Sequence, residues 1–206
     1  MSPAPAWLRE LAAKAADMDV PRMLRPPVAG GRRSAVLILF GDGPDLLFIQ
    51  RSEGLRRHPG QPAFPGGAID DGDDGPVAAA LREATEETGL DPAGVEVLGT
   101  MPELFIPHSG FRVVPVLAWW RQPSAVRPVD TGEVAAVERI PVAELADPGH
   151  RVMLHHPSGR TGPACRIGSM LIWGFTAGLV DRLLALAGWE RPWDATAIRE
   201  LPEGAA

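Results

Sequence analysis

The feature that most limits how this chain can fold is a helix with two unlike sides, predicted within residues 73–90 (DDGPVAAALREATEETGL). Asp73 or Asp74 is expected to cap it, Pro76 falls in its first turn, and Gly89 is expected to end it. Small apolar side chains recur on one side at helical spacing: Val77, Ala80, Leu81 and Ala84. This side has to be buried, so the chain must supply a sheet on which the helix can lie.

The other side of the helix carries Glu83, Glu86 and Glu87, at positions i, i+3 and i+4. At about 100° per residue these carboxylates share one side of the helix, where like charges repel. A divalent cation reverses that repulsion, and oxygen-only ligands select Mg²⁺ or Mn²⁺, which bridge carboxylates to phosphate oxygens. The pattern therefore favours metal-dependent pyrophosphate cleavage, with Arg82 paired to Glu86 one turn on. Taken alone, the cluster also fits a solvated acidic helix face.

A glycine loop and a basic segment precede this helix. In residues 64–67 (FPGG), adjacent glycines allow close approach of the backbone, so that its carbonyl or N–H groups can reach a metal or a phosphate. The basic segment contains Arg51, Arg56, Arg57 and His58, and guanidinium groups suit contact with phosphate. Ordinary solvated side chains are the alternative interpretation of these residues, above all for Arg57 and His58.

The remaining hydrophobic patterns predict helices on both faces of a sheet. A terminal helix is expected at residues 7–18, a hairpin of two strands at 34–40 and 45–50, and further strands at 95–98, 111–120 and 133–140. A short helix at 142–145 and a long one at about 167–186 follow, and the tail after Pro192 is expected to be irregular. The domain division is residues 1–30 as helix and connector, 31–190 as the catalytic domain, and 191–206 as tail, in an α/β class.

Composition excludes several other functions. The net charge of −6 argues against a protein that works by neutralising nucleic-acid phosphate. Cys165 is the only cysteine, so no intrachain disulfide can form, and this suits a reducing cytoplasm. The most apolar run, residues 167–180, is fourteen residues long, short of the roughly 20 needed to cross a bilayer, and the N-terminal segment does not read as a signal peptide. We expect a cytoplasmic protein that binds neither nucleic acid nor membrane.

The acidic helix resembles the Nudix box: Gly, five residues, Glu, seven residues, Arg-Glu, apolar, any, Glu-Glu, any, Gly, apolar. The chain has GAIDDGDDGPVAAALREATEETGL from Gly67 to Leu90. Asp74 is taken to stand where the box has its first Glu, with six residues between it and Gly67 where the box has five. The resemblance implies the Nudix fold, an α/β/α sandwich with a mixed central sheet.

A second resemblance covers residues 47–67, LFIQRSEGLRRHPGQPAFPGG. It is similar to the motif of Nudix hydrolases that act on coenzyme A, which it matches at Arg51, Ser52, Arg56, Gly60, Phe64, Pro65, Gly66 and Gly67. Phe48 and Ile49 depart from the Leu and Thr of that motif. The implied reaction is Mg²⁺- or Mn²⁺-dependent hydrolysis of coenzyme A or acyl-CoA to 4′-phosphopantetheine, or its acyl form, and adenosine 3′,5′-bisphosphate.

The resemblance also implies roles for single residues. Glu83 and Glu87 are the expected metal ligands, Glu86 is a third ligand or holds the nucleophilic water, and the carbonyl of Gly67 completes the site. Arg82 supports catalysis, Asp74 caps the helix or pairs with Arg82, and Glu133 is either a further acid or an exposed turn residue. The expected substrate-binding residues are Arg51, Arg56, Gly60, Phe64, Gly66 and Gly67. No role is assigned to His108, His155 or His156, and Trp173, Phe175 and Leu179 are expected in the core, with Trp173 as an alternative lining for a pantetheine arm.

Two other functions remain open. One is a Nudix hydrolase for another small nucleoside diphosphate derivative or related nucleotide, such as NADH, ADP-ribose or a nucleoside triphosphate. The other is a Nudix module that senses a nucleotide without cleaving it, although a sensor has no need of three mutually repelling carboxylates. The sequence leaves the oligomeric state open, with a homodimer as one alternative.

Overall fold

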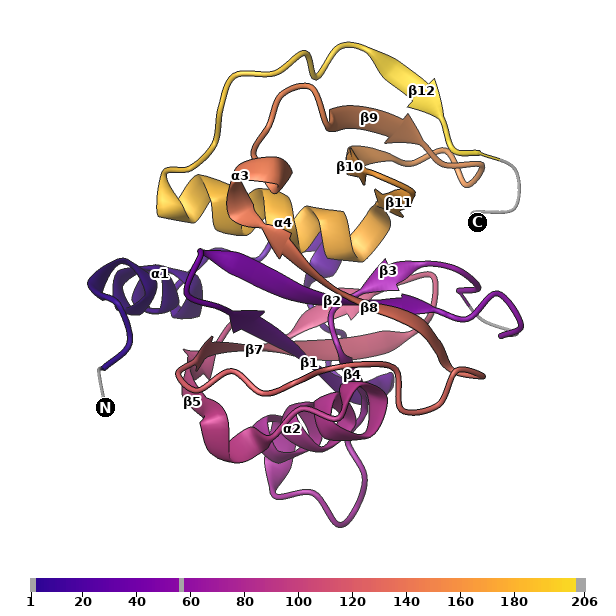
Figure 1. Ribbon diagram of the computed structural model, residues 1–206. Coiled ribbons are helices and arrows are strands. Elements are labelled where there is room, and N and C mark those ends of the chain that lie inside the picture. The colour runs from indigo at the N-terminus through magenta and orange to yellow at the C-terminus, as the bar shows by residue number, and fades with distance from the viewer. Residues whose placement is uncertain (1–2, 56–57, 203–206) are drawn as a thin grey trace.

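The computed structural model describes residues 3–55 and 58–202, which form two β-sheets and the helices that cover them (Figure 1). Sheet A has eight strands along the path β3-β2-β1-β7-β5, with β4 and β6 added to β1 and β7, and β8 added to β2. Strands β1 and β7 are parallel and the other pairs antiparallel, so the sheet is mixed. The strands of sheet A are β1 (Arg32–Phe40), β2 (Asp45–Arg51), β3 (Pro62–Ala63), β4 (Gly66–Ala68), β5 (Val95–Thr100), β6 (Leu104–Ile106), β7 (Phe111–Trp120) and β8 (Val134–Pro141).

Side chains that alternate along the central strands build a core on each face of sheet A. On one face, α2 (Gly75–Thr88) packs its alanines onto alternate residues of the two central strands, which include Leu37, Leu39, Val116 and Ala118. The residues between them face the opposite way, toward α1 (Ala6–Ala16) and α4 (Gly174–Ala187), as Ile38, Phe40 and Leu117 do. This confirms the α/β/α sandwich, because the period of two along each strand serves both faces.

The predicted limits of α2 are confirmed. Asp74 occupies the N-cap position, Pro76 lies in the first turn, and Gly89 ends the helix in the left-handed conformation with φ 70°. The hairpin of β1 and β2 is present, as are the expected strands β5, β7 and β8 and the short helix α3 (Val142–Leu145). Two 3₁₀ turns, η1 (Arg22–Leu24) and η2 (Pro92–Gly94), were not anticipated.

The long helix predicted from about residue 167 is wrong in its first part. Residues 161–172 form an antiparallel hairpin of β10 (Thr161–Ile167) and β11 (Met170–Ile172), and α4 begins only at Gly174. Ile167 pairs with Met170, so Gly168 and Ser169 form a two-residue turn between the strands. Gly168, at the first position of this turn, has φ 55°. A Gly-Ser pair between apolar runs suits this tight turn, and that signal outweighs the helical period of the residues around it.

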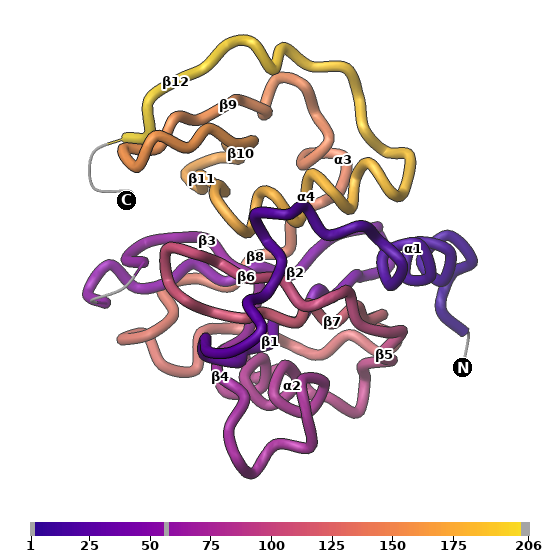
Figure 2. Tube along the Cα trace, turned by 180° about the vertical axis from the view of Figure 1, so that it is seen from behind, coloured from indigo at the N-terminus to yellow at the C-terminus, as the bar shows by residue number. Residues whose placement is uncertain are grey.

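A second correction concerns the tail. Residues after Pro192 are not wholly irregular, because β12 (Ile198–Glu200) pairs in parallel with β9 (Arg151–His155). These strands complete sheet B, in the order β11-β10-β9-β12, which lies over α4 on the side away from sheet A (Figures 1 and 2). In the described part of the chain, no helix is long and apolar enough to cross a membrane.

Candidate active site

Glu83 packs directly against the backbone of Gly67. A Cβ atom at Gly67 would lie 2.6 Å from Oε2 of Glu83 and closer still to Cδ and Oε1. Strand β4 holds Gly67 in register with Ala35 of β1, and α2 lies on the same strands. Glycine is therefore needed here for close approach, since any side chain would displace the carboxylate of Glu83.

Glu87 is bound to the other glycine of the pair. The Gly66 N–H donates a hydrogen bond of 2.9 Å to Oε2 of Glu87. The pKa of Glu87 is raised to about 8, mainly by burial; the charges of Glu83 and Glu133 add to the rise, while the Gly66 N–H and Arg51 oppose it. Burial likewise raises the pKa of Glu83. The double-glycine bend thus holds two desolvated carboxylates side by side.

Asp73, and not Asp74, is the partner of Arg82. Nε and Nη2 of Arg82 donate to the two carboxylate oxygens of Asp73, each at 2.9 Å, and this hydrogen bonding lowers the pKa of Asp73. Asp74 makes no side-chain capping hydrogen bond. Five residues separate Gly67 from Asp73, as in the Nudix box, so the extra residue of this chain follows the acid and does not precede it. Counting from Gly67 would have identified Asp73.

Arg82 also connects two of the glutamates. Its Nη1 donates to Oε1 of Glu83 and to Oε2 of Glu86, each at 3.0 Å, which confirms the expected pairing with Glu86. The Glu83 side chain is 19% exposed and that of Glu86 59%, so the acidic side of the helix is graded from buried to open. Nη2 of Arg82 additionally donates to the Ala68 carbonyl at 3.1 Å, which ties the helix to β4.

Two charged residues outside α2 act on Glu87. Arg51 ends β2, and its positive charge lowers the pKa of the Glu87 carboxyl. Its Nε is buried and has no hydrogen-bond partner in the part of the chain that the structure describes. Glu133 stands in the exposed turn before β8, and its carbonyl accepts the Ser52 N–H at 2.9 Å. Glu133 is therefore an exposed turn residue whose charge acts on Glu87, and its role as a further acid stays a prediction.

The other expected substrate-binding residues have different places. Phe64 is 3% exposed and stacks on Phe48 at 4.8 Å, so its side chain belongs to the core and holds the glycine loop without reaching a substrate. Gly60, with φ 65°, closes the loop after β2 by a 3.4 Å bond from its N–H to the Ser52 carbonyl. Arg56 and Arg57 fall outside the described residues.

The donor groups suit a hard divalent cation. Glu83 and Glu87 offer carboxylate oxygens beside the backbone of Gly66 and Gly67. Oxygen ligands of this kind are the ones that Mg²⁺ and Mn²⁺ prefer. Across residues 3–55 and 58–202, no three acidic, His or Cys side chains are already gathered closely enough to hold an ion. Arg82 holds the carboxylates of Glu83 and Glu86, and the Gly66 N–H holds that of Glu87.

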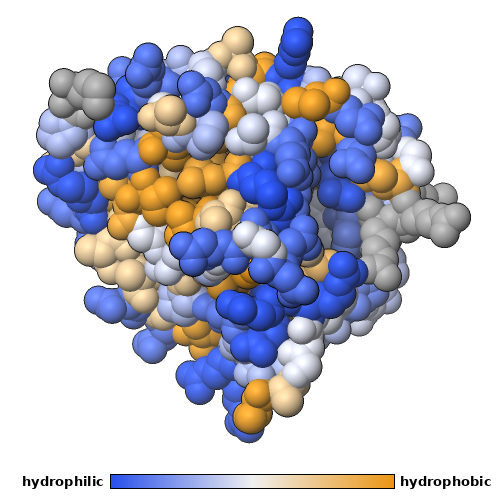
Figure 3. Space-filling model, turned by 90° about the horizontal axis from the view of Figure 1, so that it is seen from below, coloured by the Kyte–Doolittle hydropathy of each residue, from blue (hydrophilic) through white to orange (hydrophobic). Residues whose placement is uncertain are grey.

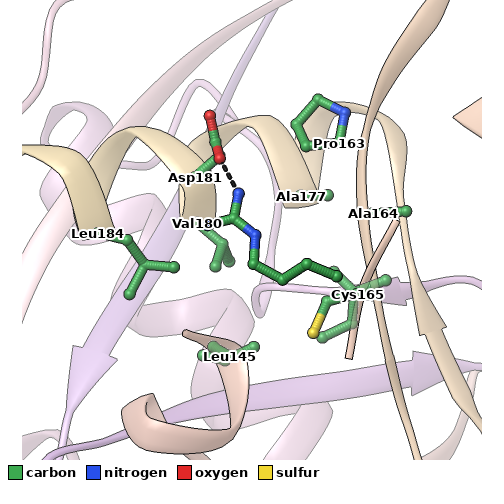
Figure 4. Close-up of a pocket in the computed structure, with 10 residues that line it drawn as sticks. Leu145, Pro163, Ala164, Cys165, Ala177, Val180, Asp181 and Leu184 are labelled. Atoms are coloured by element: carbon green, nitrogen blue, oxygen red, sulfur yellow. Dashed lines mark hydrogen bonds and ion pairs between the residues drawn. The ribbon is translucent and has the colours of Figure 1, made fainter. Parts of the chain in front are cut away.

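The surface seen from below is uneven (Figure 3). Hydrophilic residues surround a hollow right of the centre of that view, and a group of hydrophobic residues lies left of the centre. A separate pocket, shown in Figure 4, lies between α4 and sheet B and is lined by Arg151, Cys165 and Asp181 among apolar side chains. Cys165 is buried, as expected of a core residue, and burial raises the pKa of its thiol to about 11. That pocket belongs to the packing of the C-terminal sheet and not to the acidic helix.

A mixed sheet with an acidic helix on one face, docked on a double-glycine bend, is the arrangement of a Nudix domain. A model of the NUDIX domain matches residues 31–157. Curated relatives named "Uncharacterized Nudix hydrolase NudL" are 40% identical in Citrobacter koseri (83% of this chain, 92% of that protein) and 37% in Escherichia coli strain K12 (81% and 91%). The chain belongs to the Nudix hydrolase family.

Solved structures support the fold alone. A Nudix hydrolase from M. smegmatis, RenU, aligns with a TM-score of 0.51 at 20% identity, over 78% of this chain and 89% of that one. A MutT protein from Methanosarcina mazei Go1 aligns with a TM-score of 0.52 at 15% identity, over 76% and 95%.

Proposed function

We propose that this Nudix hydrolase cleaves the diphosphate bond of coenzyme A or acyl-CoA, giving 4′-phosphopantetheine, or its acyl form, and adenosine 3′,5′-bisphosphate. The observation that carries the hydrolytic site is the docking of Glu83 on Gly67 and of Glu87 on the Gly66 N–H. The motif of residues 47–67 supports coenzyme A within this class.

Glu83 and Glu87 would hold the cation, Mg²⁺ or Mn²⁺, with Glu86 as a further ligand or as the holder of water and with the Gly67 carbonyl beside them. When bound, such an ion neutralises the charge of the phosphoryl oxygens and lowers the pKa of a coordinated water. The low exposure of Glu83 and the raised pKa of Glu87 support this assignment, because two desolvated carboxylates gain most from a nearby positive charge.

Arg82 is proposed to position the glutamates. It holds Glu83 and Glu86 through one nitrogen and is itself held by both oxygens of Asp73. A guanidinium locked in this way fixes the direction from which the carboxylates face the substrate.

Arg51 is proposed to contact the diphosphate. Its position beside Glu87 and the unsatisfied Nε favour a role close to the scissile bond. Arg56, which follows in the same motif, is proposed to contact the 3′-phosphate of coenzyme A.

The test is hydrolysis by the purified protein with Mg²⁺ or Mn²⁺, with coenzyme A and dephospho-CoA as matched substrates and NADH, ADP-ribose and a nucleoside triphosphate beside them. We expect coenzyme A to give the two stated products and to be cleaved faster than dephospho-CoA. Equal rates on the pair would remove the 3′-phosphate contact. Cleavage of ADP-ribose or NADH without cleavage of coenzyme A would replace the proposed substrate, and binding without any turnover would favour the sensing module.

A further inference from the structure

Three ring side chains from distant segments meet beside sheet B. The ring of His156 stacks on that of Trp173, with centroids 5.5 Å apart and planes 22° apart. The ring of His108 stands edge-on to His156, at 6.4 Å and 67°. His108 lies in the turn between β6 and β7, His156 follows β9, and Trp173 directly precedes α4. The proposed hydrolytic reaction uses none of the three.

The orientation of the His156 ring is fixed by its own turn. The Ser158 backbone N–H donates to Nδ1 of His156 at 3.0 Å, and the Ser158 hydroxyl lies 2.7 Å from the same nitrogen. Because Nδ1 accepts, the neutral ring carries its proton on Nε2. One face of the ring lies against Trp173, and Nε2 offers one directed N–H donor.

This group of rings is connected to the hydrolytic site through a short path. Trp173 follows β11, and β11 lies against β3 (Figures 1 and 2). From Ala63, the last residue of β3, three residues lead to Gly66, which binds Glu87. These three residues of chain span at most about 11 Å between Ala63 and Gly66. Phe64, which lies between them, is buried in the core.

We propose that His156, Trp173 and His108 form a binding site for the flat heteroaromatic base of a nucleotide. This proposal rests on the proposed function in one respect: the base and the cleaved diphosphate are taken to belong to the same ligand. Aromatic side chains bind bases by stacking whatever the base, and the Nε2–H of His156 can donate to a ring nitrogen of a purine. Exposed His108, edge-on to His156, would close the site from the outer side.

The experiment measures binding of AMP to the full-length protein by calorimetry, without a divalent cation, so that no hydrolysis takes place. We expect Trp173→Ala and His156→Ala each to weaken AMP binding by roughly 5- to 100-fold, the range for loss of one stacking partner. Trp173→Phe keeps a flat ring and should bind within about threefold of the unaltered protein. Ribose 5-phosphate, which has no base, should bind to all these proteins alike.

The matched control is Trp193→Ala, because Trp193 packs over Arg151 at 4.5 Å and is no member of the ring cluster. Its AMP binding should stay unchanged. The proposal would be overturned if the unaltered protein bound no detectable AMP, or if Trp173→Ala, His156→Ala and Trp193→Ala all bound AMP equally. It would also be overturned if Trp173→Ala and His156→Ala lost ribose 5-phosphate binding as much as AMP binding. If AMP binding depends on Trp173 while coenzyme A is not cleaved, the base site stands and the proposed substrate falls.

Discussion

Arg82 and Asp73 are joined by two hydrogen bonds of 2.9 Å between the guanidinium and both carboxylate oxygens. Asp73 also accepts the Asp70 N–H at 2.9 Å, and its side chain is only 7% exposed. This pair links the loop before α2 to the part of the helix that carries Glu83, Glu86 and Glu87. Its geometry decides where Arg82 holds Glu83 and Glu86.

Asp73→Asn should lower kcat by about 10- to 100-fold, the usual effect of losing a residue that orients a metal ligand. KM should change little, because both oxygens of Asp73 are engaged by Arg82 and its effect is expected to pass through that residue. Steady-state kinetics on the hydrolysed substrate measures both constants. Asp74→Asn is the matched control and should retain nearly full activity, because Asp74 makes no side-chain capping bond. A larger loss in Asp74→Asn than in Asp73→Asn would restore the alignment in which Asp74 takes the place of the first Glu.

Gly67→Ala should reduce turnover by about 100-fold, because a methyl group at this place displaces the carboxylate of Glu83 by the order of an ångström. The loss is measured as kcat at saturating Mg²⁺, with circular dichroism to check that the fold is retained. Gly72→Ala, in the loop between β4 and α2, has nothing within 4 Å of its added Cβ and should be nearly silent. Full activity of Gly67→Ala would show that close contact with Glu83 is not required.

Glu87→Gln should abolish turnover and make the metal-free protein more stable than the unaltered one above about pH 5. The pKa of Glu87 is raised from 4.5 to about 8, so the folded state binds the extra proton between these values and its stability falls as pH rises through them. Because a tenfold change in proton affinity corresponds to about 1.4 kcal/mol, the difference in stability is at most a few kcal/mol. Urea unfolding of both proteins with a chelator, at pH 5 and pH 8, measures it. A difference in stability that does not grow with pH would contradict the burial of this carboxyl.

Cys165 should react slowly with thiol reagents at pH 8. The pKa of about 11 keeps the thiol protonated at pH 8, and the burial of the side chain keeps the reagent out. We expect at least about a tenfold slower rate than in the urea-unfolded chain, since only the exposed thiolate reacts. A colorimetric thiol assay compares the two states. Rapid reaction of the folded protein would mean that the pocket around Cys165 opens to solvent.

Much of the fold could be predicted because the patterns are local and repeated. The limits of α2 follow from Pro76 and Gly89, and the continuous apolar run in β1 predicts a strand buried on both faces. Sheet B could not be predicted in this way. Its strands are short, and β12 is fixed only by pairing with a strand more than forty residues earlier in the chain, at Met153 for Ile198.

The sequence by itself determined that Glu83, Glu86 and Glu87 share one side of a helix and that two glycines precede it, because helical periodicity and glycine's freedom are local properties. Only the tertiary structure decided that Gly67 meets Glu83, that Gly66 binds Glu87, and that Asp73 holds Arg82. It also brought Arg51 and Glu133 to the same carboxylate and gathered His108, His156 and Trp173. Contacts of this kind depend on how strands pair and how a helix is seated on them, which no local pattern specifies.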